Sequence, residues 1–96
     1  MNGNFVIHST PGFNRVLKKL SRKHPDLPER IAEIFAILQS DPYNASLRHP
    51  IRKLVAVPPG QGQYRIRSGR FRIRYDIGGG SVELVYCGLR REDTYR

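Results

Sequence analysis

Arginines recur at every second position in two neighbouring stretches of this sequence. Residues 64–67 read Tyr-Arg-Ile-Arg, and residues 70–75 read Arg-Phe-Arg-Ile-Arg-Tyr. In a β-strand, such alternation places the arginines on one face and the apolar residues on the other. Arginine is well suited to bidentate binding of phosphate groups. We therefore predict a polyanion-binding sheet face made of Arg65, Arg67, Arg70, Arg72 and Arg74.

A hairpin turn predicted at Ser68-Gly69 would bring the two arginine stretches side by side. Like charges directly across two strands are unfavourable, so a bound anion would relieve the repulsion between them. The alternative is a solvated basic face on which Asp76 and Glu83 partly balance the arginines.

The charge distribution also favours a polyanionic partner. The chain carries a net charge of +9, from 17 Lys and Arg against 8 Asp and Glu. Residues 1–47 hold six basic and four acidic residues, whereas residues 48–96 hold eleven basic and four acidic ones. Ten of those eleven are arginine and the other is Lys53. We expect the C-terminal half to contact nucleic acid.

Other kinds of chemistry have weaker support in the sequence. The three histidines, His8, His24 and His49, lack the spacing of metal ligands, and no glycine cluster has the form of a phosphate-binding loop. Cys87 at a strand end is expected to be a packed small residue. We therefore expect no metal and no small-molecule cofactor. Attack of an RNA 2′-hydroxyl on the adjacent phosphate suits arginines, because positioning and charge stabilisation supply much of the acceleration.

Length and hydropathy indicate one domain over residues 1–96 and a cytoplasmic location. No apolar run approaches the roughly 20 residues that a membrane span requires, so no membrane association is expected. The first nine residues are too polar for a secretory signal. The single cysteine excludes an intramolecular disulfide.

Hydrophobic periodicity predicts an α+β fold. A strand at residues 5–8 precedes a helix that starts at Thr10-Pro11 and ends near His24-Pro25. Asp26 opens a second helix, with Glu29 completing a capping-box pattern, and Asp41-Pro42 ends it.

The remaining chain predicts a three- to four-stranded antiparallel sheet covered by the two helices on one face. Its strands are a possible one at 51–57 and three at 64–67, 70–77 and 82–86. In the last strand, Tyr86 is expected on the same face as Val82 and Leu84.

The sequence resembles RelE-family toxins in two stretches, YRIRSGRFRIRYD at 64–76 and VELVYCGLRREDTY at 82–95. The patterns of residues 5–20 and 38–42 are also similar to that family, so the resemblance covers essentially the whole chain. It implies the fold shared by RelE and ParE toxins. It also implies a ribosome-dependent endoribonuclease that cleaves messenger RNA and is held inactive by a cognate antitoxin with an acidic segment.

The resemblance also assigns roles to single residues. Arg65 and Arg67 are similar to basic residues that hold the RNA, Arg72 and Arg90 to arginines that stabilise phosphate charge, and Tyr95 to a tyrosine that stacks on or protonates RNA. Where the family pattern carries lysines, this chain has Arg65 and Arg67, and arginine does not readily give up a proton. Either a neutral group such as Tyr95 shares the proton transfer, or catalysis is electrostatic alone, or RNA cleavage is weak. Further RNA contacts are expected from Lys53, Arg70, Arg74 and Arg91.

Two other functions fit the same pattern. A ParE-like toxin would inhibit DNA gyrase by binding, without catalysis. A nucleic-acid-binding module without toxicity would keep the fold and the basic face. The arginine alternation does not separate these from the endoribonuclease.

Overall fold

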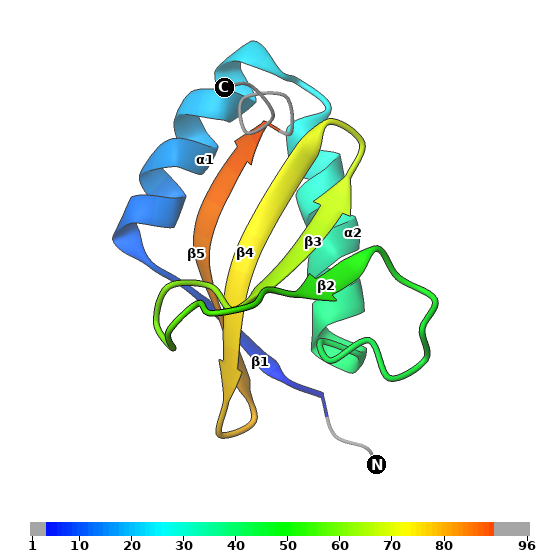
Figure 1. Cartoon of the computed structure of the whole chain (residues 1–96). Coiled ribbons are helices and arrows are strands. Elements are labelled where there is room, and N and C mark those ends of the chain that lie inside the picture. Colours follow the sequence, from blue (N-terminus) through cyan, green and yellow to red (C-terminus); the bar gives the residue numbers. More distant parts are fainter. Residues whose placement is uncertain (1–3, 90–96) are drawn as a thin grey trace.

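The computed structural model describes residues 4–89 and has an α+β architecture, as predicted (Figure 1). Two helices cover one face of a five-stranded sheet, and no helix of residues 4–89 covers the other face (Figure 1). The elements are β1 (Val6–Ser9), α1 (Pro11–Lys23), α2 (Leu27–Ser40), β2 (Ile51–Lys53), β3 (Tyr64–Ser68), β4 (Phe71–Gly78) and β5 (Ser81–Leu89).

The sheet has the strand order β1-β5-β4-β3-β2 and is mixed. β1 pairs in parallel with β5, with Val6 opposite Ser81, and the other neighbours are antiparallel. Strands β2–β5 form the predicted antiparallel sheet, and β1 adds a fifth, parallel strand that was not predicted to pair with it. The N-terminal strand joins the sheet because its backbone N–H and C=O groups require partners, which the outer edge of β5 provides.

Both helices begin where the sequence predicts, but only the first has the predicted side-chain cap. The Thr10 hydroxyl accepts a hydrogen bond from the Phe13 amide at 3.1 Å, and Pro11 occupies the first helical position. Asp26 has helical backbone angles and makes no side-chain cap, so the predicted capping box is absent. Its carboxylate instead lies 3.7 Å from the Arg30 guanidinium, one turn along the helix.

The core lies between the helices and the covered sheet face. α1 and α2 contribute Phe13, Leu27, Ile31, Ile34 and Leu38. The sheet contributes Ile66, Phe71, Ile73, Tyr75, Val82, Leu84 and Cys87. Tyr75 is fully buried and its hydroxyl donates a 2.8 Å hydrogen bond to the Pro42 carbonyl, which satisfies its polar end. Within residues 4–89, no helix is long and apolar enough to cross a membrane.

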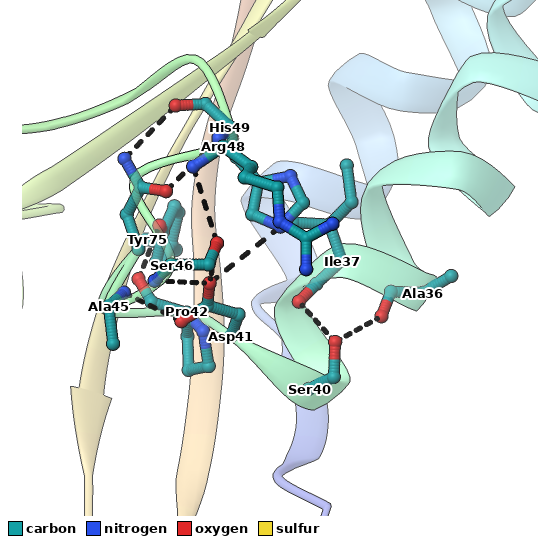
Figure 2. Close-up of polar contacts among 11 residues, drawn as sticks. Ala36, Ile37, Ser40, Asp41, Pro42, Ala45, Ser46, Arg48, His49 and Tyr75 are labelled. Carbon is teal, nitrogen blue, oxygen red and sulfur yellow. Dashed lines mark hydrogen bonds and ion pairs between the residues drawn. The ribbon is translucent and has the colours of Figure 1, made fainter.

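The loop between α2 and β2 is organised around Asp41 (Figure 2). Its carboxylate accepts hydrogen bonds from the Ser46 hydroxyl and the Ala45 amide, both at 2.7 Å. The His49 imidazole lies 3.7 Å from the same carboxylate. Because these contacts, led by that of Ser46, favour the ionised carboxylate, the pKa of Asp41 is lowered. The loop thus positions the short strand β2 for pairing with the edge of β3.

The hairpin between β3 and β4 differs by one residue from the predicted turn. Ser68 pairs with Phe71, so the two-residue loop is Gly69-Arg70 and not Ser68-Gly69. Gly69 has a φ of 60°, which suits glycine at the first position of a type II′ turn. The shift leaves the arginines at 65, 67, 72 and 74 in the strands and places Arg70 in the turn.

Candidate nucleic-acid interface

Four arginines form two directly opposed pairs on the helix-free face of the sheet. Arg65 lies opposite Arg74, and Arg67 lies opposite Arg72. Neighbouring strands are about 4.8 Å apart, and residues two positions apart along a strand are separated by about 6.8 Å. The two pairs therefore form adjacent rows. We call this surface, with Arg52 opposite Arg65 at the end of one row, the arginine face.

The arginines of this face differ in how far their side chains are exposed to solvent. Arg67 is exposed, whereas Arg65, Arg72 and Arg74 are half-buried. The Nε atoms of Arg65 and Arg72 lie below the solvent-accessible surface. Arg74 donates from Nε to the Gly62 carbonyl at 3.1 Å. The face is thus a partly ordered set of guanidinium groups, which lowers the entropy cost of binding a phosphate.

Asp76 holds a loop against this face. Its two carboxylate oxygens accept hydrogen bonds from the amides of Gly62 and Gln63, at 2.9 and 3.0 Å. The segment 54–63, in light green, consequently crosses in front of β4 and β5 (Figure 1). It limits the arginine face to the part of the sheet nearer the β3–β4 turn.

Gly62 is the point where this loop touches the sheet. It is buried with a φ of 81°, and a Cβ atom there would lie 2.7 Å from the Arg74 Cβ and 2.9 Å from the Val85 Cγ2. Only glycine fits both the backbone angle and this close approach. The loop and the arginine face are therefore one packed unit.

A β-bulge in β5 places Tyr86 on the arginine face. Arg74 pairs with Tyr86 and Tyr75 pairs with Leu84, so Val85 is an extra residue without a position opposite it. The bulge reverses the alternation, and Cys87 enters the core after it. The prediction that Tyr86 shares the face of Val82 and Leu84 was wrong. The sequence carries a signal for this, because apolar positions change from 82 and 84 to 87 and 89.

The phenol ring of Tyr86 lies over Gly88, which pairs with Arg72. A Cβ atom at position 88 would collide with the Tyr86 hydroxyl and lie 2.7 Å from the ring carbon Cζ. The ring therefore extends from the row of Arg74 toward the row of Arg72. An aromatic surface borders the guanidinium groups on the β5 side.

Two residues predicted to bind RNA lie away from the two rows. Lys53 pairs with Tyr64, whose position in β3 faces the helix side, and its Nζ lies 5.7 Å from the centroid of the Tyr64 ring. Arg70 is exposed in the β3–β4 turn, at the end of the sheet. Arg52, which the sequence analysis did not single out, pairs with Arg65 and belongs to the arginine face.

Three predicted site residues, Arg90, Arg91 and Tyr95, lie outside the described residues. Cys87 is buried in the core, and this burial raises the pKa of its thiol to about 11. A thiol with such a pKa is a poor nucleophile at neutral pH. Within residues 4–89, the arginine face therefore presents guanidinium groups and the Tyr86 phenol, while the carboxylates of Asp76 and Glu83 lie further along the same side of the sheet.

This arrangement can bind phosphate and stabilise developing negative charge on it. Guanidinium groups cannot act as general bases, because they stay protonated in proteins. No family model, curated protein or solved structure matches this chain.

Proposed function

We propose that this protein is the toxin of a toxin–antitoxin pair, and that it binds messenger RNA on the ribosome through the arginine face and cleaves it. The observation that carries the proposal is the register of β3 and β4, which sets Arg65 against Arg74 and Arg67 against Arg72. Four like charges in two adjacent rows are unfavourable by themselves. A phosphodiester backbone would turn this repulsion into attraction.

The proposed reaction is attack of the 2′-hydroxyl oxygen on the adjacent phosphorus, with the hydroxyl proton released to solvent water because a guanidinium group cannot accept it. The bond between phosphorus and the 5′-oxygen of the next nucleotide breaks, and that oxygen leaves as a 5′-hydroxyl after taking up a proton. The upstream fragment ends in a 2′,3′-cyclic phosphate. Arg67 and Arg72 would stabilise the charge on the non-bridging phosphate oxygens, and Arg65 would hold the neighbouring phosphate.

The proposal includes an acidic protein partner in the cytoplasm. A chain of net charge +9 with a concentrated arginine face would attract an antitoxin segment rich in Asp and Glu. Such a segment would occupy the same guanidinium groups as RNA. Binding of antitoxin and RNA would then be mutually exclusive.

A cell-free translation reaction tests the proposal. The purified protein is added, and the 5′ ends of the messenger are mapped by primer extension. We expect new 5′ ends at ribosome-occupied codons with the wild type and their loss in the double variant Arg67→Gln/Arg72→Gln. Arg15→Gln on the exposed side of α1 removes one charge elsewhere and should still cut.

A supercoiling assay of DNA gyrase with the same preparations completes the test. Intact messenger together with blocked supercoiling would replace the endoribonuclease by a gyrase inhibitor. No effect in either assay would overturn the toxin proposal and leave a nucleic-acid-binding module.

A further inference from the structure

The position of Tyr86 has no explanation in core packing. Tyr75 in the adjacent strand is fully buried, whereas Tyr86 keeps 36% of its surface exposed. The bulge at Val85 rotates Tyr86 out of the core and onto the face that carries the arginines. Bulges often re-aim a side chain beside a functional site.

The phenol ring of Tyr86 packs on the backbone of Gly88. The ring lies against a backbone without a side chain, and the hydroxyl and Cζ occupy the space that a Cβ atom would need. The hydroxyl end of the ring therefore lies against the strand, and more than a third of the residue stays exposed. A flat aromatic surface held in this way can accept the face of a second ring.

The arginines stand one strand away from this surface. Arg74 is directly opposite Tyr86. Arg72 is directly opposite Gly88, the residue over which the Tyr86 ring lies. Proteins that bind single-stranded nucleic acid combine a cationic track for the backbone with aromatic side chains for the bases. In duplex RNA the bases already stack on each other and do not offer a free face.

We propose that Tyr86 is the positioning residue on which one base of the RNA stacks, while the phosphates beside that base lie on Arg72 and Arg74. The inference rests on the proposed function, which it deepens. The ligand on this side of the arginine face is then an unpaired nucleotide. Stacking fixes which phosphate meets the arginines, and Tyr86 does not exchange a proton.

The test is binding of a short RNA made of 2′-O-methyl nucleotides, which lack the attacking hydroxyl. It is compared with a series of the same RNA, each carrying one abasic residue, which keeps the phosphate and removes the base. Fluorescence anisotropy gives the Kd for wild type and Tyr86→Ala. We expect Tyr86→Ala to weaken binding about 10-fold.

One abasic position should weaken binding to the wild type by a similar factor and leave binding to Tyr86→Ala unchanged. Tyr86→Phe should bind like the wild type, since the ring remains. Tyr43→Ala, at a tyrosine that is 57% exposed in the loop after α2, is the matched control and should also bind like the wild type.

A second variant separates stacking from folding. Gly88→Ala keeps the tyrosine and displaces its ring, and Gly88 does not have a positive φ that would strain alanine. We expect the same loss of affinity and the same insensitivity to the abasic residue. An abasic residue that weakens binding equally in wild type and Tyr86→Ala, at every position, would overturn the inference.

The outcome is independent of cleavage. A protein that binds this RNA through Tyr86 and never cuts a messenger would refute the proposed function and leave the stacking role intact. A protein that cuts messenger and shows no coupling between Tyr86 and a base would refute the stacking role and leave the proposed function intact.

Discussion

Replacing Arg67 by glutamine should change folding stability and RNA affinity in opposite directions. Arg67 is exposed and lies directly opposite Arg72. At the strand spacing of about 4.8 Å, two unit charges repel by about 0.9 kcal/mol at the dielectric constant of water, and longer separations of the flexible guanidinium groups lower this value. Like charges across a strand pair cost on the order of 0.2–1 kcal/mol. We therefore expect Arg67→Gln to raise the free energy of unfolding by about 0.5 kcal/mol.

The corresponding change in melting temperature is measurable. For a domain of this length, about 1 kcal/mol shifts Tm by roughly 4–8 °C, so Arg67→Gln should melt about 2–4 °C higher at low salt. Added salt screens exposed charges, so the difference should shrink at 1 M NaCl. The control Arg15→Gln lies on α1, which packs on the other side of the sheet, and should stay close to the wild-type Tm.

The same substitution should weaken RNA binding in a salt-dependent way. Each phosphate contact to single-stranded nucleic acid contributes about −0.7 to the slope of log K against log salt. If three or four arginines contact phosphates, the wild-type slope is about −2 to −3, and Arg67→Gln reduces its magnitude by about 0.7. A lower Tm together with an unchanged slope would mean that Arg67 is a structural residue, and the reasoning would fail.

Further predictions concern the elements that hold the site. Gly62→Ala should destabilise the fold by about 2–4 kcal/mol in urea unfolding, from backbone strain and overpacking against Arg74. Gly60→Ala, with a φ of 92° and open space, should cost only about 1–2 kcal/mol, and equal losses would contradict the close approach. Because folding lowers the pKa of Asp41, its ionised form stabilises the protein at pH 7, and this stability is lost as the pH falls through the folded pKa. Asp41→Asn should therefore have a lower free energy of unfolding than the wild type at pH 7, and the difference between the two should shrink below pH about 4. Urea unfolding at a series of pH values measures this difference, and a difference that does not change with pH would contradict the reasoning. The Cys87 thiol, with a pKa of about 11, should resist iodoacetamide at pH 8 until urea unfolds the chain, and rapid labelling of the native protein would exclude its burial.

Local sequence patterns predicted most of the elements. Period-two alternation located β3 and β4 and put Arg65, Arg67, Arg72 and Arg74 on one face. Thr10 and Pro11 marked the first helix because capping depends on neighbouring residues only. The two helices and the apolar sheet face that they cover followed from the same periodicity.

Local sequence patterns could not predict which strands pair when they are far apart in the sequence. Nothing near residues 6–9 indicates that β1 pairs with β5, more than 70 residues away. The role of Asp76 depends on a loop that returns to the sheet. The sequence offered Asp76 only as a partial partner of the arginines, in the alternative of a solvated face, and could not show that its carboxylate binds the amides of Gly62 and Gln63. Lys53 was grouped with the arginines by charge, although its strand position opposite Tyr64 puts it on the other face.

The bulge in β5 had the largest effect on the site. One extra residue at Val85 moved Tyr86 from the expected core face to the arginine face. Strict alternation cannot show such an insertion unless the apolar residues on both sides of it are compared. Here Leu84 and Cys87 carry that information, because both are buried although they are three positions apart.

A messenger with one 2′-deoxynucleotide in the codon at the ribosomal decoding site tests the central proposal most directly. Stalled ribosomes carrying this messenger or the all-ribose one are treated with the wild-type protein, and the fragments and their ends are analysed. We expect the all-ribose messenger to yield a 5′-hydroxyl fragment and a 2′,3′-cyclic phosphate, and the deoxy-substituted one to stay intact at that bond. Equal cleavage of both messengers, or cleavage of neither, would contradict an arginine face that positions RNA for attack by its own 2′-hydroxyl.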